Sequence, residues 1–261
     1  MRNIEIVMSY RAASVERTEN LYTVLRHLDH TYVDYTLWLM EADVSPRFDW
    51  GRLNDAKIRH VFQYNEGLFP KSLLYNLGVR LCRSSVICFH DADSIARPGL
   101  MRASVDSLLD AEVSDAICPY SGVINVAGRL KESLKVRPDF ELVESLTTDT
   151  LTDDTTALYG EANGGIVFFR KAEYIRVGGY NSSLIGWGGE DDELLSRATR
   201  LGARWHSFML PLIHLNHDNA SRRQFISTSR ESFNVKAAKA SAEMPIEDLQ
   251  SLARHLAEFF A

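Results

Sequence analysis

Short apolar runs alternate with helical patterns through the first 110 residues of the chain. Runs of β-branched and apolar residues bounded by polar positions predict strands at residues 4–10, 35–41, 58–64 and 85–91. Apolar residues that recur every three or four positions predict helices at residues 16–29, 70–82 and 98–111. Strands separated by helices of this length are typical of βαβ units. We therefore expect an α/β fold with an open, mostly parallel sheet flanked by helices.

The second half of the chain has a less regular pattern. Strand-like composition is found in AICPYSGVINV (116–126), GGIVFFRK (164–171) and RWHSFMLPLIHLNH (204–217). DELLSRATRLG (192–202) predicts a helix with a glycine stop. The sequence shows no repeat, low-complexity tract or linker, so we expect residues 1–261 to form one domain.

Residues 246–260 predict an amphipathic helix. Its apolar face is formed by Ile246, Leu249, Leu252, Leu256 and Phe259. The opposite face is polar but not basic, and a helix that docks on a membrane surface is usually basic there. We therefore expect this helix to pack on its own domain.

Composition narrows the class of protein. A net charge of −6 and a pI near 5.8 argue against a protein that binds nucleic acid mainly through electrostatic attraction to the phosphates. Cys82, Cys88 and Cys118 lack C-x-x-C spacing, and we expect them to be buried free thiols in a reducing compartment. The N-terminus enters a strand directly, and no run approaches 18 apolar residues. We expect neither a signal peptide nor a membrane span, and a cytoplasmic location.

The fourth predicted strand ends in the sequence Asp91-Ala92-Asp93. Ligands of open α/β sheets bind beyond the carboxyl ends of the strands, where these two carboxylates would lie. Hard oxygen ligands so placed suit Mg²⁺ or Mn²⁺. The same residues also fit an Asx-type turn that ends the strand, and a D-x-D motif alone does not decide between the two.

A second group of metal-binding side chains lies at the end of the last strand-like run. His214 and His217 are three residues apart and both fall outside the hydrophobic pattern. A single histidine is more often structural than a ligand, but a pair at this spacing favours metal binding. Imidazole combined with carboxylate favours Mn²⁺ over Mg²⁺.

The segment GWGGEDDE (186–193) places four adjacent carboxylates after a Trp set among glycines. Acidic residues suit the first turn of a helix, and charge runs are usually solvated. The alternative is a catalytic role, because carboxylates flanked by like charges have raised pKa values and become better bases near neutral pH. Glycines would also let the backbone approach a sugar closely.

These motifs, in this order, resemble the metal-dependent glycosyltransferases of the GT-A fold. The resemblance rests on FPKSLLYNLG, FHDAD, NGG, GGYNSSLIGWGGEDDELLSR and HLNH and spans residues 1–220. It is strongest to the β1,4-galactosyltransferase family and its relatives among chondroitin-type polymerases and polypeptide N-acetylgalactosaminyltransferases. It implies an inverting transfer of a hexose or N-acetylhexosamine from a nucleotide sugar, expected to be a UDP-sugar, to a hydroxyl of a glycan or other acceptor.

The resemblance also divides the expected domain into parts. Residues 1–95 would be the nucleotide-binding half and residues 96–220 the acceptor and catalytic half. Residues 221–261 would form a C-terminal lid segment and helix.

The resemblance assigns a metal site and a catalytic base. Asp93, His214 and His217 would hold Mn²⁺, with Mg²⁺ as the alternative. The galactosyltransferases have Met where this chain has His214, a change that keeps a metal-binding side chain. Asp191 aligns with the general base of the family.

Binding roles are implied for the remaining motif residues. Glu190 and Asp192 align with acids that contact the acceptor. The nucleotide-sugar donor would be met by Asp91 at the ribose or uridine, Lys71 near the diphosphate, Trp187 on a loop that closes over the donor, and Tyr10 and Arg11 near the uracil.

Two alternatives remain at this level. A strand ending in D-x-D also opens phosphohydrolases of the haloacid dehalogenase type, in which Asp91 would be the nucleophile. Against this, Ile95 stands where those enzymes have Thr or Val after the second Asp, and the motif follows three strands instead of opening the chain. The other alternative is a glycosyltransferase that acts on modified nucleic acid, suggested by the basic stretch at 221–239.

Overall fold

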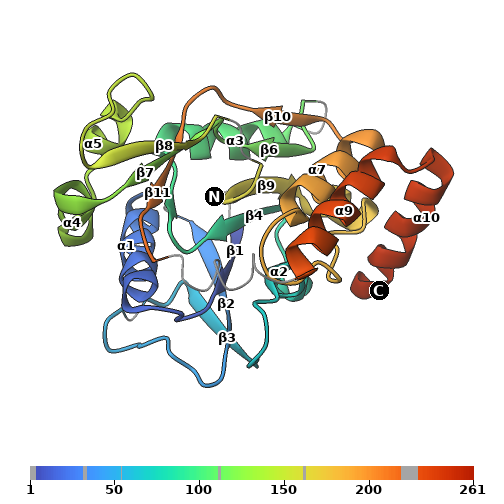
Figure 1. Cartoon of the computed structure of the whole chain (residues 1–261), viewed down its shortest axis with the longest axis horizontal. Helices are drawn as coiled ribbons and strands as arrows, with labels where there is room; N and C mark the ends of the chain where they lie inside the picture. Colours follow the sequence, from blue (N-terminus) through green and yellow to red (C-terminus); the bar gives the residue numbers. More distant parts are fainter. Residues whose placement is uncertain (1–3, 32–33, 54, 111–112, 161–162, 219–228) are drawn as a thin grey trace.

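Two β-sheets and the helices around them make up the described part of the chain (Figure 1). The computed structural model describes residues 4–31, 34–53, 55–110, 113–160, 163–218 and 229–261. Within these residues, the larger sheet has seven strands in the order β10-β6-β9-β4-β1-β2-β3 and the smaller has four in the order β5-β11-β7-β8. Residues 221–228 of the expected lid segment lie outside the described residues.

The elements have the following bounds. The strands of the larger sheet are β1 (Ile4–Tyr10), β2 (Tyr35–Asp43), β3 (Ile58–Tyr64), β4 (Val86–Asp91), β6 (Ala116–Cys118), β9 (Ile166–Arg170) and β10 (Trp205–Ser207). Those of the smaller sheet are β5 (Ser94–Ile95), β7 (Val123–Val126), β8 (Thr155–Tyr159) and β11 (Leu212–Leu215). The helices are α1 (Val15–Thr31), α2 (Lys71–Leu81), α3 (Pro98–Leu109), α4 (Gly128–Val136), α5 (Phe140–Ser145), α6 (Lys171–Arg176), α7 (Glu190–Arg200), α9 (Ser229–Glu243), α10 (Ile246–Ala257) and the 3₁₀ turn η1 (Glu258–Phe260).

Strand β1 lies at the point where the strand order reverses. It pairs in parallel with β2 on one side and with β4 on the other. Strand β9 is antiparallel to both β4 and β6, while the other neighbouring pairs of the larger sheet are parallel. The predicted mostly parallel sheet is confirmed. Because ligands of such sheets bind at the reversal point, the carboxyl ends of β1 and β4 mark the place to look for a site.

The alternation of side chains along β1 separates the core into two layers. Ile6 and Met8 pack into a cluster with α1, and Val7 packs into a second cluster with α2 on the opposite face. Gly78 allows α2 to lie directly on the sheet, because a Cβ at this position would come within 2.2 Å of Val7 Cγ1. Burial on both faces explains why apolar residues at adjacent positions, such as Ile6, Val7 and Met8, occur in β1.

Two segments that read as single strands are each divided between the two sheets. Residues 116–126 form β6 in the larger sheet and β7 in the smaller one, and residues 204–217 form β10 and β11 in the same way. Gly122 has a φ of +74° in the bend between β6 and β7, a backbone conformation that favours glycine. Within each of these two segments the chain therefore passes from the larger sheet to the smaller one, and β11 runs parallel to β7.

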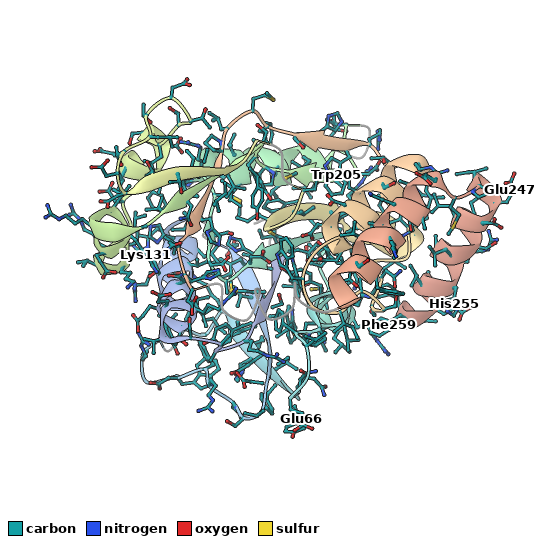
Figure 2. The ribbon with its side chains drawn as sticks, in the orientation of Figure 1. Glu66, Lys131, Trp205, Glu247, His255 and Phe259 are labelled. Atoms are coloured by element: carbon teal, nitrogen blue, oxygen red, sulfur yellow. The ribbon has the colours of Figure 1, made fainter. Side chains whose placement is uncertain are left out.

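The C-terminal helix packs on its own chain, as predicted. Leu249 and Ala253 of α10 are buried, and the helix contacts α6 and α7. Figure 2 shows Glu247, His255 and Phe259 on the outer part of the molecule at this end. The Arg80 guanidinium of α2 lies 5.6 Å from the centre of the Phe259 ring.

Two further expectations concern the cysteines and the membrane. Cys82, Cys88 and Cys118 are free and buried, as predicted. Every helix within the described residues is too short or too polar to span a lipid bilayer.

Candidate functional site

A cavity of about 790 Å³ lies at the carboxyl ends of β1 and β4. Its walls come from both sheets, from the start of α2 and α7, and from the glycine-rich loop at 186–189. The structure brings all of the sequence-predicted site residues to this one cavity: Tyr10, Arg11, Lys71, Asp91, Asp93, Trp187, Glu190, Asp191, Asp192, His214 and His217. Residues from distant parts of the sequence therefore share a single site.

Asp93, His214 and His217 form a compact group of potential metal ligands. One ligand atom from each residue lies within 4.8 Å of the others. The Nε2 atoms of His217 and His214 lie 3.1 and 3.8 Å from Asp93 Oδ2. Burial alone would raise the pKa of Asp93, but His214, His217 and Arg17 outweigh it and hold that pKa well below its usual range. The carboxylate is thus ionised and ready to bind a cation.

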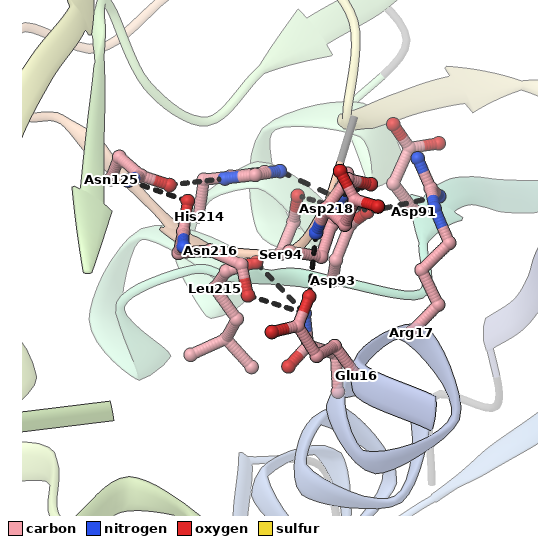
Figure 3. Close-up of polar contacts among 12 residues, drawn as sticks. Glu16, Arg17, Asp91, Asp93, Ser94, Asn125, His214, Leu215, Asn216 and Asp218 are labelled. Carbon is pink, nitrogen blue, oxygen red and sulfur yellow. Dashed lines mark hydrogen bonds and ion pairs between the residues drawn. The ribbon is translucent and has the colours of Figure 1, made fainter. Parts of the chain in front are cut away.

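Both histidines are oriented through the second ring nitrogen, Nδ1, and Figure 3 shows this for His214 and Asn125. His214 Nδ1 lies 2.8 Å from Asn125 Oδ1, and His217 Nδ1 lies 3.0 Å from the backbone oxygen of Asp218. Oxygen acceptors at Nδ1 fix the tautomer that leaves Nε2 free as a ligand. Burial also lowers the pKa of His214, which favours the neutral ring that binds metals.

Three side chains hold the backbone that carries His217. Asn20 Nδ2 of α1 donates to the Leu215 carbonyl at 2.8 Å, and Lys131 Nζ of α4 donates to the Asn216 carbonyl. Glu16 Oε2 accepts from the backbone N–H of residue 218 at 2.6 Å. The segment after β11 is therefore fixed against the first turns of α1.

Lys71 lies at the centre of a cluster of carboxylates on the other side of the cavity. Its Nζ is 3.1 Å from Asp191 Oδ2, 3.4 Å from Glu190 Oε1 and 3.5 Å from Asp91 Oδ1. Burial would lower the pKa of Lys71, but the surrounding carboxylates raise it well above its ordinary value. The lysine stays charged and holds the three acids together.

Two buried tyrosines fix the orientation of two of these acids. Tyr75 donates to Asp91 Oδ1 at 2.7 Å, and Tyr180 donates to Asp191 Oδ1 at 2.8 Å. Burial raises the pKa of both phenols well above the ordinary value, so each remains a hydrogen-bond donor. Asp191 thus has one oxygen on a tyrosine and the other on Lys71.

Glu190 is the acid of the block whose pKa is raised, to about 7. Burial is the main cause, the charge of Asp191 adds to it, and Lys71 partly offsets it. Its Oε2 is buried and has no hydrogen-bond partner among the described residues. The sequence predicts raised pKa values from crowding of like charges, and the pKa of Glu190 is raised, mainly by burial and less by that crowding.

The acidic block forms the first turn of α7, which reconciles its two interpretations. Gly189 precedes the helix with a φ of +83°, and residues 190–193 follow in the helix. Glu193 is fully buried with Arg197, at 2.8 Å from its Nε, and Arg197 also donates to the Gly179 carbonyl at 2.6 Å. This buried pair fixes α7 while the three acids before it line the cavity.

The segment 163–165 approaches these acids closely. Asn163 Nδ2 donates to Asp192 Oδ1 at 3.0 Å. A Cβ at Gly164 would lie 1.9 Å from Asp191 Oδ2, and Gly165 has a φ of +95°. Gly164 therefore leaves room for the Asp191 carboxylate, and Gly165 has a backbone conformation that favours glycine.

Tyr10 and Arg11, the predicted donor-binding residues at the end of β1, line the cavity and are held by contacts with neighbouring elements. The Tyr10 hydroxyl lies 3.0 Å from Thr18 Oγ1, and burial raises its pKa to about 12. Arg11 donates to the carbonyls of Ala42 and Gly67, each at 2.8 Å, and its guanidinium lies 5.4 Å from the centre of the Phe69 ring. Arg11 thus holds the ends of neighbouring strands and the loop before α2.

Several residues of the site were missed by sequence reasoning. Tyr75 lies one helical turn after Lys71, so its position on the predicted helix was a usable signal. Tyr180, Asn125 and Arg17 carry no motif of their own, and their place in the site follows from the fold.

Trp187 lies on the loop that sequence reasoning placed over the donor. It lines the cavity and is 38% exposed. An apolar ring at this place is suited to shielding part of the cavity from water.

A family profile for the N-terminal domain of galactosyltransferase matches residues 154–218. The matched segment contains Gly164 and Gly165, the acidic block at 190–193, and both His214 and His217. No curated protein sequence matches the chain.

Similar solved structures share the fold. The catalytic domain of Drosophila β1,4-galactosyltransferase 7 with xylobiose has 16% identity, a TM-score of 0.51, and coverage of 84% of this chain and 72% of its own. A mutant of that enzyme, in complex with manganese, UDP-Gal and xylobiose, has 14% identity and a TM-score of 0.53. The similarity covers 85% of this chain and 74% of the mutant enzyme's chain. Glucosyl-3-phosphoglycerate synthase from Mycobacterium tuberculosis, in complex with Mn²⁺, UDP and phosphoglyceric acid, has 15% identity and a TM-score of 0.55. The similarity covers 92% of this chain and 78% of the synthase chain.

These likenesses confirm the predicted GT-A fold and the predicted resemblance to galactosyltransferases. The profile match and the fold together support the predicted class of enzyme, a glycosyltransferase.

Proposed function

We propose that the cavity is the active site of an inverting, metal-dependent glycosyltransferase. The enzyme moves a hexose or N-acetylhexosamine from a UDP-sugar to a hydroxyl of a glycan or other acceptor. The observation that carries the proposal is that a group of potential metal ligands and the acidic block line the same cavity. Residues 1–95 would form its nucleotide-binding half and residues 96–220 its acceptor half.

The residues present fit the implied metal. Asp93, His214 and His217 offer one carboxylate oxygen and two imidazole nitrogens, a donor set that suits Mn²⁺ better than Mg²⁺. When bound, the metal would neutralise negative charge on the departing diphosphate.

Asp191 is proposed as the general base. Its carboxylate would take the proton from the acceptor hydroxyl while that oxygen forms a bond to the anomeric carbon of the donor. The bond from the anomeric carbon to the diphosphate oxygen breaks, and its electron pair leaves with the diphosphate. Attack from the face opposite the leaving group gives inversion in a single displacement. Tyr180 and Lys71 support this role because they fix both oxygens of Asp191.

The other residues of the cavity would bind the two substrates. Glu190 and Asp192 would accept hydrogen bonds from acceptor hydroxyls, and Asn163 orients Asp192 for this role. Trp187 would cover the donor and exclude water, which limits wasteful hydrolysis. Tyr10, Arg11, Lys71 and Asp91 also line the cavity and would complete the donor contacts.

Gly164 offers a test of the proposed position of the base. In Gly164→Ala, the new methyl group would displace the Asp191 carboxylate, because the Cβ would lie 1.9 Å from Oδ2. We expect kcat to fall by roughly 10²-fold, the effect of about 1 Å of misplacement at a reacting group. UDP affinity should change little.

The matched control is Gly160→Ala, because a Cβ at Gly160 would meet nothing within 4 Å. Steady-state kinetics of both variants and calorimetric titration with UDP provide the comparison. Equal kcat values for the two variants would contradict the proposed position of the base.

The proposed class of reaction is tested by the products. The protein should first be screened for a stabilising nucleotide sugar with Mn²⁺ by thermal shift, since a ligand that binds the folded state raises Tm. Incubation of that donor with candidate acceptors should release UDP and give a glycosylated product. Release of inorganic phosphate from a phosphomonoester, with transient phosphorylation of Asp91 and no donor binding, would contradict the proposal and favour a phosphohydrolase.

A further inference from the structure

An apolar strip runs outward from the cavity at one end of the smaller sheet. Its exposed side chains are Leu158 (42% exposed), Tyr159 (42%), Leu210 (38%) and Met209 (86%). Leu158 and Tyr159 line the cavity, whereas Leu210 and Met209 are not among its lining residues. The strip therefore begins in the proposed active site and ends on the surface of the protein.

The strip is continuous because its segments are neighbours in the fold. Val123 of β7 pairs with Leu212 of β11 on one side and with Tyr159 of β8 on the other. Just before this row, the backbone N–H of Ser121 donates to the Leu210 carbonyl at 3.0 Å. The connection from β10 to β11, which carries Met209 and Leu210, therefore lies next to the row that ends in Tyr159.

The segments that form the strip carry no charged residue. They are residues 121–123, 157–160 and 207–212, in a chain of which 25% of the residues are charged. Single exposed apolar side chains are ordinary on a protein surface. A group of them that continues the wall of a ligand cavity indicates a binding surface.

The side chains of the strip suit an alkyl chain better than additional sugar rings. Sugar hydroxyls need polar partners, and a ligand site for them supplies a few well-placed hydrogen-bonding groups. Beyond Tyr159, the large exposed side chains of the strip are Leu210 and Met209. Met209 is unbranched and polarizable, so it adapts to a flexible apolar chain.

The strip adjoins the acceptor part of the cavity. Asn163, four residues after Tyr159, donates to Asp192 Oδ1 at 3.0 Å. Gly164 lies directly against the proposed base, because a Cβ there would come within 1.9 Å of Asp191 Oδ2. A substituent on an acceptor sugar that is bound at these acids therefore has the strip as its neighbouring surface.

We propose that the acceptor is a glycoside with an alkyl-chain aglycone, as in a glycolipid, and that the strip binds the part of the chain next to the sugar. This inference rests on the proposed function and names the class of acceptor for the same site. The aglycone takes no part in the bonds that form and break. It contributes binding, because apolar surface of the chain and of the strip is removed from water together.

The proposal predicts a preference between acceptors that differ only in the aglycone. Methyl and n-octyl glycosides of glucose, galactose, xylose and N-acetylglucosamine form matched pairs, used below the concentration of micelle formation with the UDP-sugar found by thermal shift. For an accepted sugar, kcat/KM should be at least roughly tenfold higher with the octyl glycoside, because each methylene removed from water contributes about fourfold in affinity. The difference should lie in KM, since the chain is bound equally before and during transfer.

The double variant Met209→Ser, Leu210→Ser tests the assignment to the strip. It should remove most of the preference by raising KM for the octyl glycosides. The matched control is Val136→Ser, which changes an 81% exposed apolar side chain of α4 that does not line the cavity. This control should keep the wild-type preference, and Tm should show that both variants remain folded.

Three results would overturn the inference. The first is equal kcat/KM of wild type for the two members of each accepted pair, and the second is an octyl preference that the double variant retains. The third is a wild-type chain that binds UDP with Mn²⁺ but transfers sugar to none of the octyl glycosides. If sedimentation shows self-association that the double variant loses, while octyl and methyl glycosides react equally, the strip is a contact between copies of the chain. Failure of wild type to bind UDP with Mn²⁺ would instead overturn the proposed function, and this inference with it.

Discussion

Replacing Asp191 with asparagine is expected to lower the rate of sugar transfer by roughly 10²–10⁴-fold, the usual contribution of general base catalysis. Asparagine keeps the size of the side chain and can still accept the hydrogen bond from Tyr180. It cannot take the proton of the acceptor hydroxyl. UDP affinity should change little, because Lys71 retains its contacts with Asp91 and Glu190.

The neighbouring acids are the controls for this experiment. Removing one charge from a cluster changes the pKa values of the others, so Glu190→Gln and Asp192→Asn should be measured alongside. We expect these two changes to act more on the KM for acceptor than on kcat. Near-normal turnover of Asp191→Asn, or retention of the anomeric configuration in the product seen by NMR, would remove Asp191 from the proposed role.

The second large effect is expected at the metal ligands. Asp93→Ala, His214→Ala and His217→Ala should each weaken Mn²⁺-dependent UDP binding by more than about a hundredfold, beyond the ten- to hundredfold typical of changes in the surrounding shell. The reason is that each change removes one of three ligand atoms that lie within 4.8 Å of one another. Calorimetric titration with UDP, with and without chelator, measures the loss.

His206→Ala is a suitable control, because His206 is an exposed histidine on β10 and does not line the cavity. Circular dichroism and Tm should show that all four variants remain folded. UDP binding that is indifferent to chelator and to all three ligand changes would mean that this group does not hold the metal.

Much of the larger sheet could be predicted from the sequence because its central strands are buried on both faces. Strands β1 and β3 begin and end where the apolar runs do, and α1 and α2 differ from prediction by one or two residues. The smaller sheet was not predictable, because its strands are short and two of them continue segments that start in the larger sheet. Helix α9 was also missed, because large apolar residues such as Phe233 and Val235 lie exposed on it.

The members of the site were predictable where a motif carried them. D-x-D, the acidic block and the paired histidines each had a recognisable spacing in the chain. Contacts between motifs were not predictable, because Lys71 and Asp191 are 120 residues apart and only the fold brings them together. The same holds for Asn125 and His214, which pair because β7 and β11 are neighbours in the smaller sheet.

The measurement that tests the account most directly is the location of manganese in crystals grown with UDP and Mn²⁺. Anomalous scattering at the manganese edge identifies the ion independently of the surrounding density. We expect one peak within coordination distance of Asp93, His214 and His217, with the diphosphate of UDP as a further ligand. UDP bound in another part of the molecule, or a manganese peak that none of these three side chains contacts, would contradict the account.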